Sequence, residues 1–161
     1  MNEKKITRRA MLASAAQVSV ATFAFGVLLP FDARADSAVK ITVYKDPSCG
    51  CCTKWVEHLR ASGLALTVRD RTDMDALKDS LGVPVALRSC HTAVAGKYVI
   101  EGHVPASDLK RLIARAPKGI VGIAVPDMPA GSPGMEMGKR RDRYDVIAFA
   151  VGGKTSVFAR H

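Results

Sequence analysis

Residues 39–63 read VKITVYKDPSCGCCTKWVEHLRASG. Apolar and polar side chains alternate from Val39 to Tyr44, which is typical of a strand, and Asp46-Pro47 ends the alternation. From Cys52 onward, apolar side chains recur at helical spacing until Gly63, a residue suited to end a helix. The cysteines of this stretch are therefore expected in a loop that opens a helix directly after a strand.

The chain beyond residue 63 continues to alternate between strands and helices. The pattern predicts strands at residues 64–68, 91–95 and 97–101, and helices at residues 72–81 and 105–116. Thr72-Asp73 offers capping side chains at the start of the first of these helices, and Gly82 is expected to end it.

This order, β-α-β-α-β-β-α with a cysteine pair between the first strand and the first helix, resembles the thioredoxin superfamily, and its small glutaredoxin-like members most of all. The resemblance covers about residues 39–116 and implies an α/β fold in which helices flank a central mixed sheet. Two additions follow it: a Met-rich loop within residues 120–143, and a β-hairpin made by residues 144–151 and 155–160.

The N-terminus has the three parts of an export signal. A basic start containing Arg8-Arg9 precedes an uncharged stretch from Ala10 to Pro30, and Ala33-Arg34-Ala35 forms a small-x-small cleavage site. The paired arginines before Met11-Leu12 resemble a twin-arginine signal. We therefore expect residues 1–35 to be a cleaved twin-arginine-type signal peptide and residues 36–161 to be a single domain in the periplasm.

A membrane anchor is the alternative interpretation of the same stretch. Its apolar part is short, rich in Ala, Ser and Thr, and interrupted by Gly26 and Pro30, so it is poorly suited to span a bilayer. No stable membrane anchor is expected after cleavage.

The chain is basic, with a formal net charge of +9. The densest basic run, residues 139–143, is expected in a loop, and no aromatic residues alternate with it to stack on bases. The basic charge is therefore interpreted as a solvated surface, and no nucleic-acid partner is expected.

The chemistry is concentrated in Cys49-Gly50-Cys51-Cys52. Cys49 and Cys52 have the C-x-x-C spacing of a redox motif, and Cys51 adds a third thiol between them. The unpaired N–H groups and the dipole of a helix N-terminus favour thiolate over thiol, and thiolate is the form that binds metal.

The thioredoxin resemblance predicts where the fourth cysteine lies. Cys90-His91 aligns with the segment that carries a cis-proline before the third strand of that superfamily, and this segment faces the C-x-x-C loop. If the alignment holds, Cys90 joins the other three sulfurs and His91 lies beside them.

A site of clustered thiolates selects Cu(I), Zn(II) or an iron-sulfur centre. Zinc is the less favoured metal here because structural zinc sites usually use paired knuckles, whereas adjacent Cys51 and Cys52 are better suited to bridge ions in a multinuclear Cu(I) cluster. Candidate additional ligands are the imidazole of His103 and three thioethers, which favour Cu(I) over Zn(II): Met128, Met135 and Met137.

The motifs taken together look like those of the CopG-type family of periplasmic, thioredoxin-like copper-resistance proteins, long classified as a domain of unknown function. They are Cys-Gly-Cys-Cys before Trp55, Ser89-Cys90-His91-Thr92, Glu101-Gly102-His103-Val104-Pro105, and Met128-Pro129 with Gly131–Glu136. The resemblance implies a copper-homeostasis protein whose four cysteines hold copper, as a cysteine-bridged cluster able to change redox state.

Other interpretations of these residues remain open. Cys49 and Cys52 also fit a thiol-disulfide oxidoreductase, with Cys49 as nucleophile and Cys52 as resolving thiol. A third possibility is delivery of copper to a periplasmic copper-handling partner. Two structural disulfides are disfavoured, because a bond between neighbouring Cys51 and Cys52 strains the peptide.

Packing is the competing interpretation for the additional ligands. His91 and His103 can serve as ligands, as proton-transfer groups or as packed side chains, and the methionines can simply fill space against the sheet. His58 is expected on the surface, and His161 is expected to fray at the chain end.

Overall fold

The computed structural model describes residues 39–161. The predicted signal peptide, residues 1–35, and the predicted mature start at Asp36 lie outside the described residues. Within residues 39–161, no helix is long and apolar enough to cross a membrane.

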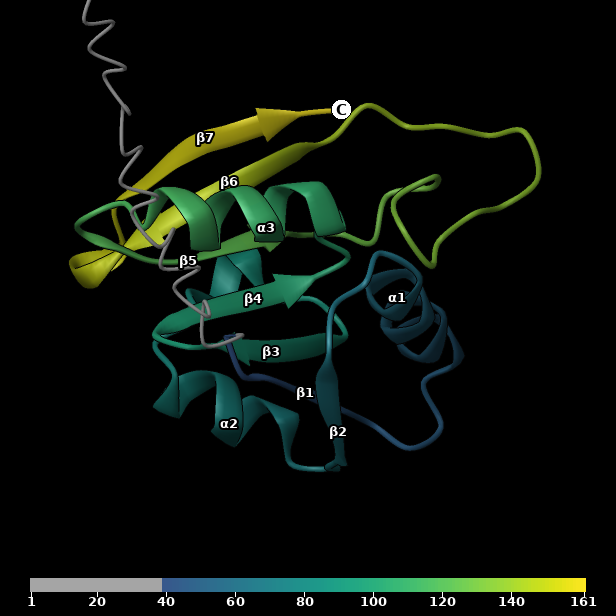
Figure 1. Ribbon diagram of the computed structural model, residues 1–161, viewed down its shortest axis with the longest axis horizontal. Helices are drawn as coiled ribbons and strands as arrows, with labels where there is room; N and C mark the ends of the chain where they lie inside the picture. Colours follow the sequence, from purple (N-terminus) through teal and green to yellow (C-terminus); the bar gives the residue numbers. More distant parts are fainter. Residues whose placement is uncertain (1–38) are drawn as a thin grey trace, which may run out of the picture. The chain divides into compact units, whose positions relative to one another are not determined.

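The described chain forms one mixed sheet with three α-helices (Figure 1). The strands are β1 (Ile41–Lys45), β2 (Leu66–Asp70), β3 (His91–Ala95), β4 (Tyr98–Gly102), β5 (Ile120–Val125), β6 (Asp145–Ala150) and β7 (Thr155–Arg160). The helices are α1 (Gly50–Ala61), α2 (Met74–Ser80) and α3 (Ala106–Arg115), with short 3-10 turns at Val85–Leu87 and Val151–Gly153. The α/β class is confirmed, as is the predicted order of elements through α3.

The strands lie in the order β2-β1-β3-β4-β5-β6-β7. β1 pairs parallel with β2, and β4 pairs parallel with β5, while the other four pairings are antiparallel. β1 and β3 are therefore neighbours near the middle of the sheet. This pairing brings the end of β1, which leads to the cysteine triplet, beside the start of β3, which follows Cys90.

Both faces of the sheet are covered by apolar side chains. Trp55, Leu59, Leu109 and Leu112 from α1 and α3 pack on one face, together with the side chains of β1, β3 and β4 that point to it. The other face holds a smaller cluster of Val83, Leu87, Val99, Ala124 and Phe149. Successive residues of a strand point to opposite faces, so Val99 and Ile100 contribute to different clusters.

α1 begins at Gly50, two residues before the predicted Cys52, so Cys51 and Cys52 lie in its first turn rather than in the loop before it, and the helix ends just before Gly63 as predicted. Asp46 turns the chain after β1 by accepting the Ser48 N–H through its carboxylate at 2.8 Å and the Cys49 N–H through its carbonyl oxygen at 3.0 Å. At the other end Gly63 has φ of 79°, and its N–H donates to the Arg60 carbonyl oxygen at 2.8 Å. A residue without Cβ adopts this left-handed conformation at little cost, which is why glycine ends the helix.

Two sequence predictions are corrected by the structure. Asp73 lies at the N-cap of α2, but its carboxylate pairs with the Arg71 guanidinium, with 2.7 Å from Nε to Oδ1, and caps no backbone N–H. Residues 120–125, predicted as part of a loop, form β5. Their apolar side chains are buried on both faces between β4 and β6, and Gly122 interrupts the alternation by which a strand is usually identified.

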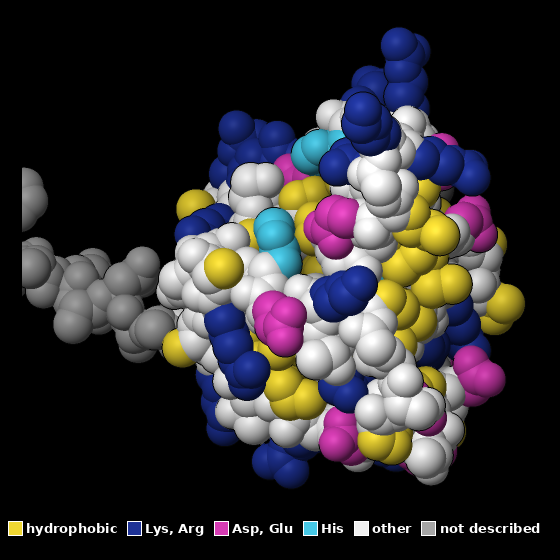
Figure 2. Space-filling model, turned by 90° about the vertical axis from the view of Figure 1, so that its right-hand side faces the viewer, with side chains coloured by type: hydrophobic (Ala, Val, Ile, Leu, Met, Phe, Trp, Pro, Cys, Tyr) yellow, Lys and Arg dark blue, Asp and Glu magenta, His cyan; other side chains and the backbone are white. Residues whose placement is uncertain are grey.

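The predicted C-terminal hairpin is confirmed as β6 and β7, with the turn at Gly152-Gly153. The basic run at residues 139–143 lies in the loop that connects β5 to β6 and is mostly exposed. Figure 2 shows the face of the molecule on which α1 and this loop lie, and Asp and Glu side chains are interspersed there among Lys and Arg.

Candidate metal centre

The four cysteines meet at the N-terminal end of α1. Cys49 is the N-cap of α1, Cys51 and Cys52 lie in its first turn, and Cys90 immediately precedes β3. Their four sulfur atoms all lie within 4.8 Å of one another. The pairing of β1 with β3 explains this juxtaposition, because Lys45 at the end of β1 pairs with His91 at the start of β3.

The four sulfurs are chemically unequal. Cys49 and Cys52 are joined in a disulfide with their Cα atoms 5.4 Å apart, whereas Cys51 and Cys90 are free thiols. The Cys51 sulfur lies 3.5 Å from the Cys49 sulfur and 3.8 Å from the Cys90 sulfur. The C-x-x-C pair is therefore in its oxidised state, with two unpaired thiols beside it.

Two histidines extend the cluster into the protein. His103 Nε2 lies 3.1 Å from the Cys90 sulfur, and His91 Nδ1 lies 3.3 Å from it. Both imidazoles are fully buried, and their rings meet edge to face with centroids 4.9 Å apart. Trp55 packs against the His91 ring at a centroid distance of 4.3 Å, and its indole N–H donates to the Val104 carbonyl oxygen at 2.8 Å.

The hydrogen bonds of His103 determine its tautomer. Its Nδ1 lies 2.8 Å from the Pro133 carbonyl oxygen, and since a carbonyl oxygen only accepts, Nδ1 must carry the proton. Burial lowers the pKa of His103, which favours the neutral ring. In that neutral ring Nε2 bears a lone pair directed toward Cys90, which is the arrangement of a metal-ligating histidine whose other nitrogen is fixed by a hydrogen bond.

Burial affects Cys90 and His91 in opposite directions. Desolvation, reinforced by neighbouring Cys51, raises the pKa of the Cys90 thiol to about 12. Desolvation, reinforced by the positive charges that His103 and Lys78 can carry, lowers the pKa of His91 well below its usual value. Both groups are therefore held neutral, and among the described residues the His91 Nε2 atom has no hydrogen-bond partner. The nitrogen that faces the Cys90 thiol is the other one, Nδ1, at 3.3 Å, and a neutral imidazole nitrogen beside a thiol fits the donor set of a soft metal site.

A buried ion pair holds the segment that carries Cys90. The Glu101 carboxylate accepts hydrogen bonds from Lys78, from the Ser89 N–H at 2.6 Å and from the Thr92 hydroxyl at 2.6 Å. Lys78 Nζ also donates to the Ser89 carbonyl oxygen at 2.7 Å. The N–H and the carbonyl oxygen of Ser89, the residue before Cys90, are therefore both held by hydrogen bonds. In the sequence Glu101 is visible only as part of a motif, and no local pattern connects it with Lys78, which is 23 positions away in the chain.

The Met-bearing loop lies against the cysteine end of α1. Gly134 lies so close to the α1 backbone that a Cβ on it would be 2.8 Å from the Cys51 carbonyl oxygen and 2.9 Å from the Trp55 backbone nitrogen. The Met135 side chain is half-buried, whereas those of Met128 and Met137 are exposed. The loop, which lies beside α1 in Figure 1, supplies the Pro133 backbone carbonyl that orients His103.

Two histidines predicted to lie on the surface or to fray have defined partners instead. His58 is half-buried, and its Nε2 accepts the Ala106 N–H at the start of α3 at 3.1 Å. His161 Nε2 lies 2.7 Å from the buried Asp108 carboxylate, and the His161 ring stacks on Tyr144. Both serve the packing of α3. Nothing in the local sequence signals these contacts, because each joins elements that are distant in the chain.

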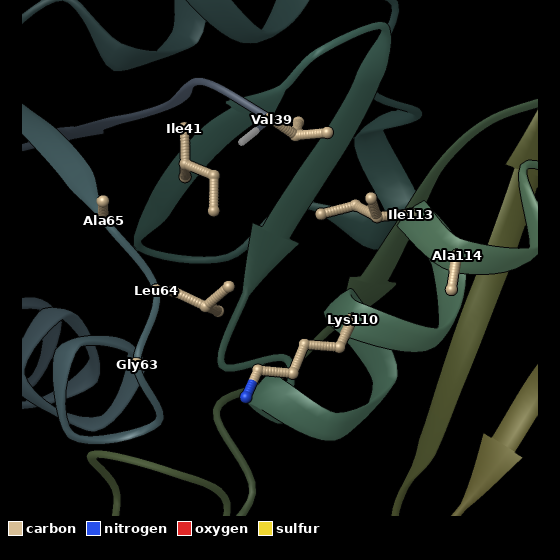
Figure 3. A pocket seen from close by; sticks show the side chains of 8 residues that line it. All are labelled: Val39, Ile41, Gly63, Leu64, Ala65, Lys110, Ile113 and Ala114. Atoms are coloured by element: carbon tan, nitrogen blue, oxygen red, sulfur yellow. The ribbon is translucent and has the colours of Figure 1, made fainter. Parts of the chain in front are cut away.

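A separate cavity of about 320 Å³ lies beyond the C-terminal end of α1 (Figure 3). Its lining is mostly apolar, with Ile41, Leu64 and Ile113 facing one another and the Lys110 amine at the rim. A helix of this length separates it from the cysteines by about 18 Å. Because its lining contains neither thiol nor imidazole, it is unrelated to the metal-binding chemistry.

Comparison with known proteins places this arrangement in a family. Residues 87–135 match the family described as "Protein of unknown function, DUF411". Two solved structures of copper resistance protein copG, its forms 2 and 1, share 46% and 47% sequence identity with the chain, each with a TM-score of 0.72. The matches cover 76% and 77% of this chain and 98% of each of those chains. No curated protein matches the chain. The matched DUF411 segment carries Cys90, His91 and His103, and the two structural matches extend over most of the chain, so this protein belongs to the CopG-type family of copper-resistance proteins.

Proposed function

We propose that this chain is a periplasmic copper(I)-binding protein of copper homeostasis and resistance, which holds copper in its four-cysteine cluster. The observation that carries the proposal is the meeting of four sulfur atoms within 4.8 Å at a helix N-terminus. The membership in a copper-resistance family supports copper as the metal. The order β2-β1-β3-β4, with β1 parallel to β2 and antiparallel to β3, supports a thioredoxin-like fold for the first part of the domain.

The donor set favours Cu(I) over zinc. Thiolates and thioethers are soft ligands, and they select Cu(I) more strongly than carboxylates or water do. Adjacent Cys51 and Cys52 cannot both turn their sulfurs toward one ion without strain, but each can bridge two ions. A cysteine-bridged cluster of several Cu(I) ions therefore fits the site better than one tetrahedral zinc ion.

In the proposed mechanism the disulfide is the redox partner of the metal. Opening the Cys49–Cys52 bond consumes two electrons and two protons and yields two thiols. In the reverse direction, the two thiols deliver two electrons to two Cu(II) ions, which become Cu(I), and release two protons as the disulfide closes. Cys51 and Cys90 remain free thiols when the Cys49–Cys52 disulfide is closed. His103 and the thioethers of Met128, Met135 and Met137 are proposed as additional ligands.

The test is metal content. Residues 36–161, reduced and supplied with Cu(I) in the presence of a competing chelator, are expected to retain copper that native mass spectrometry counts. Replacing Cys90 with Ser removes the sulfur that bridges the triplet to β3, so this variant is expected to retain fewer ions. A reduced wild-type chain that emerges free of copper contradicts the proposal.

A thiol-disulfide oxidoreductase is the second candidate, and the Cys49–Cys52 disulfide is the observation that favours it. The variant that separates the two is Cys51→Ser, which leaves the C-x-x-C pair intact. An oxidoreductase retains dithiol exchange in this variant, whereas a copper cluster loses ions. Full copper binding together with no exchange activity in the wild-type chain excludes the enzyme.

We further propose that residues 1–35 direct the chain to the periplasm and are removed there. The basic start, the apolar stretch and the small-x-small site support this proposal. N-terminal sequencing of the protein recovered from the periplasm tests it, and a mature N-terminus at Asp36 is expected. Copper delivery to a periplasmic copper-handling protein remains a further proposal.

A further inference from the structure

We propose that Cys90, His91 and His103 form a one-ion site of their own, which remains available while Cys49 and Cys52 are joined in the disulfide. The protein would then bind a single borderline metal ion when oxidised and several Cu(I) ions when reduced, with Cys90 shared between the two sites. The inference deepens the proposed function and rests on it, since it assigns a distinct role to the buried half of the same site.

The geometry of the three donors is close to that of a bound ion. In a tetrahedral site, a sulfur at about 2.3 Å and a nitrogen at about 2.0 Å from the ion lie about 3.5 Å apart. The Cys90 sulfur lies 3.1 Å from His103 Nε2 and 3.3 Å from His91 Nδ1. Entry of an ion requires each sulfur–nitrogen pair to separate by only a few tenths of an ångström, and the two imidazole nitrogens already lie within 4.8 Å of each other, so the three donors are gathered around one position.

Independent contacts hold each donor in place. The Pro133 carbonyl oxygen fixes the proton of His103 on Nδ1 and leaves Nε2 for the ion. His91 is packed against Trp55 on one side and His103 on the other. The Cys90 segment is clamped by the Lys78–Glu101 pair through Ser89. None of these contacts involves Cys49 or Cys52, and the Cys52 sulfur lies 3.9 Å from the Cys90 carbonyl oxygen, so the contacts that hold the three donors do not depend on the disulfide.

The disulfide separates the two sites chemically. A disulfide sulfur carries no negative charge and is a poor ligand, so oxidation removes two of the four thiolates from the cluster. What remains is Cys51 at the edge and Cys90 with two imidazoles in the interior. One thiolate with two imidazoles suits a borderline ion, Cu(II) or Zn(II), rather than a cluster of soft Cu(I) ions.

Reduction converts the chain that binds one ion into the chain that binds several Cu(I) ions, and an external dithiol is the reductant. The dithiol is oxidised to its own disulfide and supplies two electrons and two protons, and the Cys49–Cys52 bond breaks to give two thiols. Cys90 then bridges the interior ion to those at the triplet. The interior ion would be the first bound and the last released.

Co(II) is a suitable probe for the oxidised state because it does not exchange electrons with thiols and its spectrum reports the ligands. The chain from residue 36 on, with its disulfide closed and two free thiols verified by thiol counting, is titrated with Co(II). We expect one ion per chain, a single sulfur-to-cobalt charge-transfer band and the intense visible bands of tetrahedral coordination. An oxidised chain that binds no Co(II), or binds it without the sulfur band, overturns the inference.

Two pairs of variants locate the ion. Cys90→Ser is expected to abolish the charge-transfer band, whereas Cys51→Ser is expected to keep it, although both positions are half-buried free cysteines. His103→Gln is expected to weaken Co(II) binding by at least about 10-fold. His161→Gln removes an imidazole that contacts Asp108 and Tyr144 and belongs to neither ligand group, so this variant serves as the control and is expected to bind like the wild-type chain. A band lost in Cys51→Ser and kept in Cys90→Ser contradicts the assignment.

The same preparations distinguish this inference from the proposed function. After reduction, the wild-type chain is loaded with Cu(I) and its ions are counted. Several Cu(I) ions in the reduced chain with no Co(II) in the oxidised chain disproves the separate interior site and leaves the proposed function standing. Failure of the reduced chain to bind Cu(I) disproves the proposed function itself. Circular dichroism of each variant confirms that loss of binding is not loss of fold.

Discussion

Glu101 shows at the level of one residue how the centre depends on groups that never touch the metal. Its carboxylate is fully buried and satisfied by three donors, of which Lys78 carries the compensating charge. Burial raises the pKa of Glu101 even so, which indicates that desolvation outweighs the favourable charge of its partner. Such a pair adds little net stability when complete but is costly to break.

We therefore expect Glu101→Gln to destabilise the protein by about 3–5 kcal/mol, because Lys78 is left buried beside an uncharged partner. Chemical denaturation of the disulfide form measures the free energy of unfolding. Asp75→Asn is the matched control, since it breaks the exposed ion pair with Arg88 and is expected to change stability by less than about 0.5 kcal/mol. Equal losses in both variants contradict the role assigned to the buried pair.

A second residue-scale prediction concerns His58 and pH. Desolvation lowers the pKa of His58, partly opposed by the negative charge of Glu136, and its Nε2 accepts the Ala106 N–H only when that nitrogen is unprotonated. The unfolded chain thus binds a proton at His58 more readily than the folded chain does. The stabilisation from neutral His58 is present above about pH 6.5 and is lost as the pH falls below it.

The measurement is the free energy of unfolding between about pH 7.5 and pH 5. We expect His58→Leu to be less stable than the wild type at the upper end, because the Ala106 N–H of α3 loses its acceptor, and to lose less stability on acidification. The difference between the two chains should therefore shrink toward pH 5. Parallel pH profiles exclude His58 as the group responsible.

At the scale of elements, the loop between β5 and β6 forms part of the candidate metal centre and does more than connect β5 to the β6–β7 hairpin. Gly134 has φ of 85°, and its backbone lies against the first turns of α1 near Cys51 and Trp55. The neighbouring Pro133 carbonyl orients His103. The loop therefore joins the start of α1 to the segment after β4.

Gly134→Ala is expected to lift the loop from α1. The added Cβ meets the Cys51 carbonyl oxygen, and the left-handed conformation costs a residue with a side chain about 1 kcal/mol more. We expect a loss of about 1–3 kcal/mol in unfolding free energy and weaker metal binding, since His103 loses its positioning carbonyl. Gly138→Ala, in the same loop at φ of 58° but with no atom near the added Cβ, is the control for strain alone. Similar effects in both variants contradict a docking role for Gly134.

The elements also show how far sequence reasoning reaches. The strand and helix around the cysteine triplet follow from local alternation, helical spacing and a terminating glycine, and all of these are local signals. β5 was not predicted because a strand buried on both faces lacks alternation and Gly122 obscured the apolar run. The position of Cys90 followed only from resemblance to a known fold. The contacts of His58, Lys78 and His161 depend on packing between distant elements, which no local pattern encodes.

At the scale of the whole molecule, the metal centre joins four segments of the chain. The start of α1, the segment before β3, the segment after β4 and the Met-bearing loop meet through Cys51, Cys90, His103 and Pro133. In the absence of metal they are joined by weak sulfur contacts and single hydrogen bonds. A bound ion replaces some of these with coordinate bonds, so binding free energy becomes stability of the folded chain.

We expect metal loading to protect all four segments from backbone hydrogen exchange at the same time. A free Cu(I) concentration about 100-fold above the dissociation constant stabilises the folded state by about 2.7 kcal/mol. That free energy opposes any local opening that breaks a ligand or its positioning contact, so the protection should appear in residues 49–53, 88–92, 101–105 and 131–135 together. The β6–β7 hairpin, which contributes no proposed ligand, should exchange as before. Hydrogen-exchange mass spectrometry of the reduced chain with and without Cu(I) measures this pattern. Protection confined to residues 49–53 would show that the triplet binds copper alone, without Cys90 or the loop.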